Sequence, residues 1–182
     1  MAVDHSRLLT YEDYAAFPDD GTRREIIQGR VVVTPAPTTR HQRLVLRFGA
    51  LFHDHLRQHG GGEAFIAPTD VLLSEHDIVQ PDVLFIADER GEIVTEANIA
   101  GTPTLAIEIV SDPRTDRVRK RDLYARTGAA EYWIVDPDAD RIEVHRLDGS
   151  TYGKPKIYER GETLTTPLLP GLHVDLEDLL RR

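Results

Sequence analysis

VQPDVLFIAD at residues 79–88 and TPTLAIEIVSDP at residues 102–113 decide the expected fold of this chain. Each is largely an apolar run typical of a buried strand, and each has one carboxylate within its apolar part, Asp82 in the first and Glu108 in the second. An ionised carboxylate is costly to bury without a partner. A divalent cation bound between the two acids would supply that partner.

A basic helix and a third strand follow these two runs. RTDRVRKRDLYARTG at 114–128 has a helical pattern, and EYWIVDP at 131–137 is an apolar strand. On the helix, Lys120 shares a stripe with Leu123 and Tyr124, because residues three and four apart lie on one face. We therefore expect Lys120 to border the buried face.

Period-two alternation predicts which way Glu108 points. It separates the strand into two faces, with Leu105, Ile107 and Ile109 on one and Ala106, Glu108 and Val110 on the other. Glu108 should therefore point away from the main apolar face, beside small neighbours that leave room for a ligand.

The remaining segments predict a mixed α/β fold, a strand core flanked by helices, with added β-hairpins. The expected helices are 10–17 and 41–60, with a hairpin over 24–35 turning at Gln28-Gly29; the expected strands are 63–74, 77–88, 141–148 and 155–161. Pro81 inside one strand indicates an edge position or a bulge. No repeat or linker divides the chain, so we expect one domain over residues 1–182.

Composition narrows the classes of function. The chain has no cysteine, which excludes disulfides and thiolate metal sites, and its net charge of -9 argues against indiscriminate binding to polyanions. The N-terminus lacks an apolar signal core, and no run approaches the ~20 apolar residues of a membrane span. A soluble, cytoplasmic protein without membrane contact is expected.

Two basic helix faces leave local binding to phosphate groups open. Six basic residues lie between Arg114 and Arg126, namely Arg114, Arg117, Arg119, Lys120, Arg121 and Arg126, and a second row comprises Arg40, Arg43 and Arg47. Either row alone is best interpreted as a solvated helix face. Two such faces near an acidic site make a phosphate channel plausible.

Four further residues are candidates for supporting the site or binding substrate. Glu25 is either a rim carboxylate or, preferably, an exposed edge-strand charge. His41 either contacts a phosphate or helps the site, or else it is a capping or solvated histidine, and Asp70 either supports the metal or marks the start of a strand. Tyr124 shares the helix stripe of Lys120.

Several segments, in this order, resemble one known family. They are REIIQGRVV, RHQRLVLRF, the Pro81-Asp82 pair, Glu108 within LAIEIVSDP, and KRDLYARTGAAEYWIVDP. Together they are similar to the Uma-type family of restriction-endonuclease-like proteins, part of the PD-(D/E)xK nuclease superfamily. The resemblance runs from about Thr10 to the C-terminal PGLHVDLEDLL.

The resemblance implies metal-dependent cleavage of DNA by a mixed sheet flanked by helices. By position, Asp82 matches the PD aspartate and Glu108 the acid of the (D/E)xK element, whereas Val110 stands where that element has its lysine. In relatives with this change a lysine from the following helix can reach the site, and Lys120 is the matching candidate.

The expected cofactor is Mg²⁺ or Mn²⁺, because hard cations suit one or two carboxylates, a backbone carbonyl and retained waters. Asp82, Glu108 and the carbonyl of Ile109 would form that set, and Lys120 would orient water or stabilise oxyanion charge. Three interpretations remain open: an active endonuclease, which we favour, an inactive nuclease-fold protein that binds nucleic acid, and a structural protein. Cutting both DNA strands would most simply use a homodimer.

Overall fold

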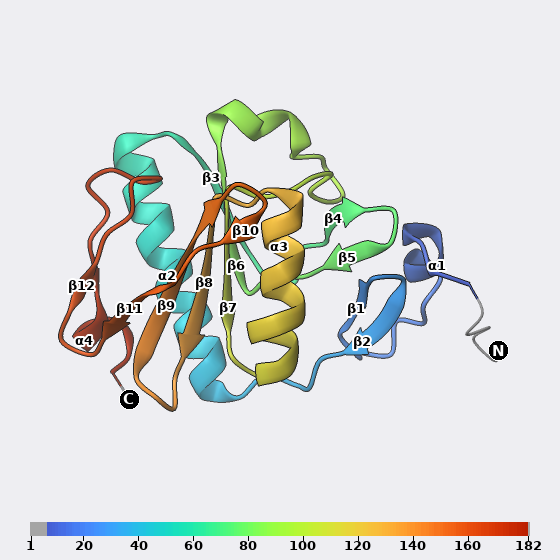
Figure 1. Ribbon diagram of the computed structural model, residues 1–182, viewed down its shortest axis with the longest axis horizontal. Coiled ribbons are helices and arrows are strands. Elements are labelled where there is room, and N and C mark those ends of the chain that lie inside the picture. The colour runs from blue at the N-terminus through green and yellow to red at the C-terminus, as the bar shows by residue number, and fades with distance from the viewer. Residues whose placement is uncertain (1–6, 182) are drawn as a thin grey trace.

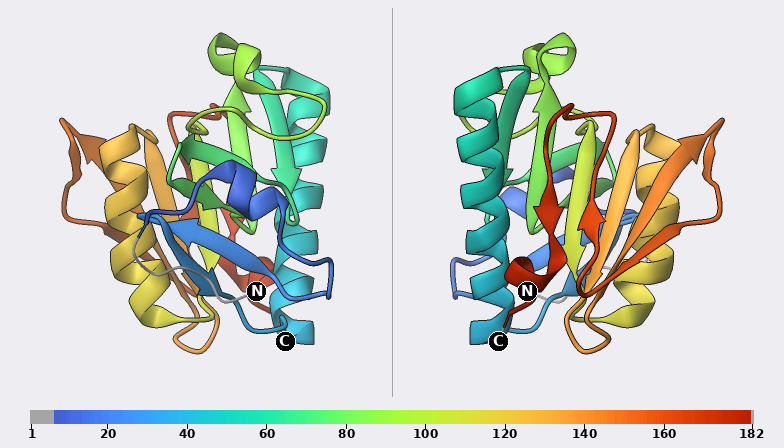
Figure 2. Two further views of the ribbon diagram at one scale, coloured as in Figure 1. Left: turned by 90° about the vertical axis from the view of Figure 1, so that its right-hand side faces the viewer. Right: turned by 90° about the vertical axis from the view of Figure 1, so that its left-hand side faces the viewer.

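The computed structural model describes residues 7–181, and its centre is a seven-stranded mixed sheet with a helix on each face (Figures 1 and 2). The order is β10-β9-β8-β7-β6-β3, with β11 paired to β9. The strands are β3 (Gly62–Ile66), β6 (Val83–Ala87), β7 (Leu105–Ile109), β8 (Glu131–Asp136), β9 (Arg141–Asp148), β10 (Thr151–Tyr152) and β11 (Lys156–Glu159). The neighbours β7 and β8 run parallel, whereas the other pairs of this sheet are antiparallel.

A smaller sheet packs beside the large one. Its order is β2-β1-β5-β4, and its strands are β1 (Arg24–Ile27), β2 (Arg30–Val33), β4 (Val71–Ser74) and β5 (Asp77–Val79). The hairpin between β1 and β2 turns where expected, at Gln28 and Gly29, which both have positive φ. Two short strands, β12 (Thr163–Leu164) and β13 (Val174–Asp175), form a separate pair.

The helices lie against both sheets, with α1 packed on the small one. They are α1 (Tyr11–Ala15), α2 (Thr39–His59), the 3₁₀ helix η1 (Asp88–Ile93), the π-helix η2 (Thr115–Lys120), α3 (Arg121–Thr127) and α4 (Leu176–Leu179). Figure 2 shows α2 on one side of the sheet and α3 on the other. The expected mixed α/β architecture is confirmed. Within residues 7–181 no helix is long and apolar enough to cross a bilayer.

Two apolar layers follow from the alternation predicted for β7. Leu105, Ile107 and Ile109 pack with α2 in the larger core, and Ala106 packs with the residues of α3 in the second. Glu108 shares the face of Ala106, because side chains two apart on a strand point the same way. Its predicted orientation away from the main apolar face is therefore confirmed.

The two long strands expected over 63–74 and 77–88 are wrong. Each is broken in two, around Pro68 and around Pro81, so that β3 and β6 belong to the large sheet and β4 and β5 to the small one. Proline lacks the N–H that would continue a ladder of hydrogen bonds, which gives each break its physical reason. The chain passes from one sheet to the other at these points, and Asp82 lies at the second.

Candidate active site

Asp82 and Glu108 come together where the small sheet meets the large one. Strands β6 and β7 are antiparallel, with Val83 opposite Ile107. Asp82, one residue before Val83, therefore comes level with Glu108, one residue after Ile107. Both carboxylates are buried.

Three groups hold the Asp82 carboxylate. The backbone N–H of Ile109 donates to Oδ2 at 2.9 Å, and Nε2 of His41 lies 3.0 Å from the same oxygen. Nη1 of Arg23 donates to Oδ1 at 3.2 Å. Burial raises the pKa of Asp82, but the His41 contact, the Arg23 charge and the Ile109 hydrogen bond outweigh it, and the pKa is lowered overall. Asp82 is therefore kept ionised.

Lys120 reaches two acids at once. Its Nζ lies 2.9 Å from Oε1 of Glu108 and 2.9 Å from Oε1 of Glu25. The lysine is only 2% exposed and Glu25 is 0% exposed, so this contact excludes solvent. Burial lowers the pKa of Lys120, but the charges of Glu108, Glu25 and Asp116 raise it overall. Lys120 is thus a permanent cation inside the cluster.

Several carboxylates lie close together in this buried cluster, so their ionised forms repel one another and are poorly solvated. Burial, with the nearby charges of Asp82 and Glu25, raises the pKa of Glu108 well above its usual value even though Lys120 lowers it. Burial also raises the pKa of Asp116, against the charge of Lys120. An additional cation at this place would relieve that repulsion.

The π-helix η2 presents Lys120 to the acids. Its Asp116 carboxylate accepts from the N–H groups of Ser111 at 3.0 Å and Asp112 at 3.1 Å, and the hydroxyl of Tyr132 donates to the Asp116 carbonyl at 2.9 Å. Sequence periodicity predicted one regular helix over 114–128. The wider π turn at its start is a departure often found at functional sites.

The four supporting candidates have different outcomes. Glu25 does not lie on an exposed edge, because β1 lies between β2 and β5, so the preferred interpretation of this residue is wrong. The interpretation of His41 as a capping or solvated residue is wrong, because Thr38 is the N-cap, its Oγ1 accepting from the His41 N–H at 3.2 Å, and His41 is buried. Its ring contacts Asp82, so it belongs to the site, and a phosphate contact stays a prediction.

Asp70 and Tyr124 lie farther from the two central acids in the network of contacts. Asp70 accepts from the hydroxyl of Tyr14 at 2.7 Å and from Nε2 of Gln80 at 2.8 Å, and the Gln80 backbone donates to Glu25 at 2.7 Å. Tyr124 is fully buried, and its hydroxyl has no hydrogen-bond partner within residues 7–181. Burial and the charges of Glu108 and Glu25 raise its pKa.

Sequence reasoning missed Arg23 and Asp116. Arg23 also donates to the Gln80 carbonyl, which ties the entrance of β1 to the break before β6. Its spacing of two from Glu25 was the available signal, since residues two apart share a strand face. Asp116 gave a weaker signal, an acid among the basic residues of its helix.

Of the nine residues in the two basic rows only Lys120 is buried, so the interpretation of each row as a mainly solvated helix face holds, although several of the arginines pair with acids. Arg117 pairs with Glu143 and with Asp136, the latter at 2.6 Å, and Arg126 pairs with Asp77 at 2.8 Å. In the second row, Arg40 lies 2.9 Å from Asp140 and Arg47 donates to the Leu179 carbonyl at 2.6 Å. The exposed arginines of the two rows are Arg43, Arg114, Arg119 and Arg126.

The donor chemistry of the cluster suits a hard cation. No preformed group of three His, Asp or Glu ligands occurs within residues 7–181. Mg²⁺ needs no such cage, because it binds through one or two carboxylates and keeps several waters. The unpartnered buried hydroxyl of Tyr124 and Nε of Arg23 are polar groups that waters or a ligand at this place would satisfy.

Comparison with known proteins identifies the fold and the family. A solved structure described as a putative nuclease belonging to DUF820, from Anabaena variabilis ATCC 29413, matches with a TM-score of 0.79 and 19% identity over 94% of this chain and 97% of that chain. At that identity the likeness shows the fold. A search of curated proteins gave no match. The family model Uma2, described as "Putative restriction endonuclease", matches residues 11–177, and the chain therefore belongs to that family.

Proposed function

We propose that this protein is a Mg²⁺- or Mn²⁺-dependent endodeoxyribonuclease that acts as a single domain. Asp82, Glu108 and the carbonyl of Ile109 are the proposed metal ligands, and Lys120 is the proposed catalytic cation. The observation that carries the proposal is the position of the Lys120 ammonium, 2.9 Å from the Glu108 carboxylate on the neighbouring strand. Family membership and the nuclease-like fold support it.

A divalent cation, when bound, supplies charge neutralisation at the scissile phosphate and lowers the pKa of water. Asp82 is prepared for binding it, because Arg23 and His41 favour its ionised form. Glu108 gains more than Asp82 from a new positive charge, since its own pKa is raised by burial and by the surrounding acids.

Lys120 provides positive charge that does not depend on pH in the neutral range. Its raised pKa keeps the ammonium protonated, so its role is to hold water or phosphate oxygen by hydrogen bonds and to stabilise negative charge as it develops. Glu25 positions the ammonium from the other side at 2.9 Å. Tyr124 and Asp70 support the site from the periphery.

The proposed partner is DNA, contacted through local charge. The net charge of -9 makes long-range attraction to DNA unfavourable, so contacts must come from exposed arginines such as Arg114, Arg119 and Arg43. A two-fold dimer would place one site on each DNA strand.

A second function, DNA binding without cleavage, is favoured by one specific observation. Both Asp82 oxygens are already engaged, by Arg23 on one side and by His41 and Ile109 on the other. If those contacts never yield to a cation, the fold keeps its acids as a structural ion network.

Cleavage of supercoiled plasmid separates the two functions. The proposal predicts nicked and linear products in Mg²⁺ and Mn²⁺ series and intact plasmid in EDTA, with loss of cleavage in Glu108→Gln. Absence of cleavage over the whole series, together with salt-dependent DNA binding, would support the inactive binding protein instead.

A further inference from the structure

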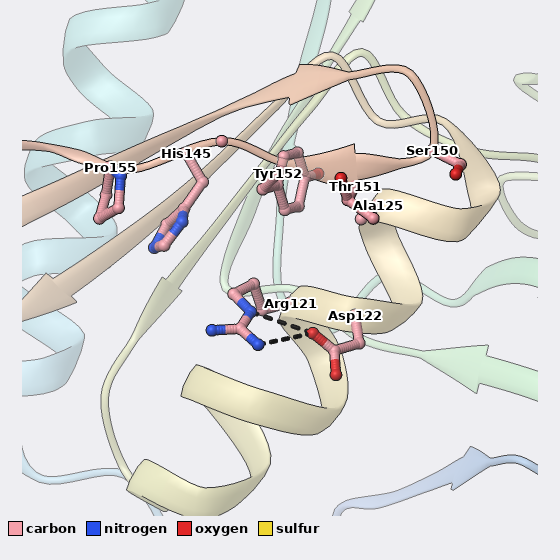
Figure 3. A pocket seen from close by; sticks show the side chains of 9 residues that line it. Arg121, Asp122, Ala125, His145, Ser150, Thr151, Tyr152 and Pro155 are labelled. Carbon is pink, nitrogen blue, oxygen red and sulfur yellow. Dashed lines mark hydrogen bonds and ion pairs between the residues drawn. The ribbon is translucent and has the colours of Figure 1, made fainter.

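A pocket of about 320 Å³ lies between α3 and the hairpin of β9 and β10 (Figure 3), and no residue of the acid cluster lines it. It is lined by Arg121, Asp122, Ala125, His145, Ser150, Thr151, Tyr152, Gly153 and Pro155. Its volume is at the lower end of the ~300–1,000 Å³ typical of ligand pockets. It therefore suits a compact ligand.

Arg121 contributes to this pocket a donor group that takes no part in its contact with Asp122. Its Nε and Nη2 donate to Oδ1 of the adjacent Asp122 at 3.0 and 2.8 Å, which fixes the plane of the guanidinium. Figure 3 shows both bonds directed to the same side of the guanidinium. Nη1 is left for another acceptor, and the side chain is 39% exposed, so an incoming ligand can reach it.

His145 contributes a buried imidazole in which one ring nitrogen makes no hydrogen bond within residues 7–181. The residue is only 5% exposed, and that nitrogen is Nε2. The nearest acid oxygen, Oε2 of Glu143, lies 3.7 Å away, which is too far for a hydrogen bond. Burial lowers the pKa of His145, with the charge of Arg121 acting in the same direction and Glu143 opposing. The neutral form of the ring is therefore favoured, in which one of the two nitrogens carries the proton and donates.

The wall that faces α3 is formed by the hairpin, on which Tyr152 lies beside His145 with the ring centroids 5.9 Å apart (Figure 3). The Tyr152 ring stacks on Tyr132, with centroids 6.2 Å apart and planes at 15°, and its hydroxyl donates to the Ala129 carbonyl at 3.0 Å. Pro155 and Ala125 add apolar surface, and the hydroxyls of Ser150 and Thr151 add donors.

We propose that this pocket binds a nucleoside monophosphate, with its phosphate at Arg121 and its base against the wall formed by Tyr152 and Pro155. A guanidinium edge, an imidazole and hydroxyls are phosphate donors, and a fixed aromatic wall suits a base. The site is separate from the acid cluster, because Lys120 is directed inward to Glu108 whereas the next residue, Arg121, is directed to the pocket. The proposal does not rest on nuclease activity.

Binding is tested on the full chain in EDTA, so that no metal bridges a phosphate to the acid cluster. The histidine side-chain NMR signals are followed while inorganic phosphate, deoxyadenosine 5′-monophosphate or deoxyadenosine is added, and His145→Gln assigns the His145 signal. The monophosphate is expected to shift that signal saturably. Arg121→Gln should weaken binding about tenfold or more, as expected for loss of a charged hydrogen bond.

Arg119→Gln is the matched control, because Arg119 is an exposed arginine on the preceding turn that does not line the pocket. It should bind like the parent. Tighter binding of the monophosphate than of inorganic phosphate would support the proposal, whereas equally tight binding of inorganic phosphate would overturn it, because the base would then take no part. No saturable shift, equal binding of deoxyadenosine, or an equal defect in Arg119→Gln would overturn it.

Discussion

The ammonium of Lys120 lies 2.9 Å from the Glu108 carboxylate although 12 residues separate them in the chain. Val110, two residues after Glu108, occupies the position where the nuclease superfamily carries its lysine. The π-helix η2 therefore brings the ammonium of Lys120 to β7, the strand at whose end Val110 leaves no positive charge. This relationship gives the proposed active site its full set of residue types.

Glu108→Gln and Asp82→Asn should each abolish plasmid cleavage while leaving the fold intact. Each variant removes an ionised ligand, keeps the side-chain volume, and reduces repulsion among the buried carboxylates. Circular dichroism and gel filtration check the fold. Parental cleavage rates in the folded variants would place the site elsewhere.

In EDTA, the free energy of unfolding should fall as the pH rises above about the ordinary Glu value of 4.5. Glu108 has a raised pKa in the folded state, so the folded protein binds its proton more tightly than the unfolded chain does. The stability from that proton is present at lower pH and is lost as the pH rises through the folded pKa. Thermal unfolding of Glu108→Gln should show a flatter pH dependence; identical curves for the two proteins would contradict this.

Arg23→Gln should move the acidic limb of the cleavage profile to higher pH. Arg23 lowers the pKa of Asp82, so its removal lets that carboxylate protonate earlier as the pH falls. The matched control is Arg24→Gln, because the adjacent Arg24 pairs with Asp20 at the surface, at 2.7 Å. The same shift in both variants would mean that overall charge is responsible rather than the contact with Asp82.

Tyr124→Phe and Tyr132→Phe should change stability in opposite directions. The Tyr124 hydroxyl is buried without a partner within residues 7–181, so removing it should raise the metal-free unfolding free energy by about 1 kcal/mol. The Tyr132 hydroxyl donates to the Asp116 carbonyl at 2.9 Å, so removing it should cost about 1 kcal/mol. Urea denaturation measures both, and equal losses would show that water already satisfies Tyr124.

The sequence was sufficient to predict the mixed α/β fold and the family. It also predicted the direction of Glu108, because strand alternation is a local property that tertiary packing preserved. The helical stripe that Lys120 shares with Leu123 and Tyr124 correctly predicted that Lys120 borders the buried face, because side-chain spacing along a helix is also a local property.

What the sequence could not predict depended on contacts between distant segments. The strands break at Pro68 and Pro81, and the chain passes between two sheets there. A proline in a strand can also mark a bulge within one sheet, and which of the two occurs depends on the strands with which the following segment pairs. Glu25 is buried partly because β5 pairs with β1, with Ile78 opposite Ile26, although one helix and three strands separate them in the chain. The pairing of Arg117 likewise depends on acids of β8 and β9.

Single-turnover cleavage by Lys120 variants at saturating DNA and metal tests the central claim most directly. Lys120→Met leaves two buried acids without their cation, which can destabilise the fold. The double variant Glu25→Gln/Lys120→Met removes one charge of each sign and is therefore expected to fold. Both should cleave about 10²–10³-fold more slowly than the parent, the loss typical of a removed oxyanion donor. Arg119→Ala should mainly weaken DNA affinity and recover at low salt. Parental rates in the folded Lys120 variants, or defects that low salt rescues equally in all three, would contradict the account.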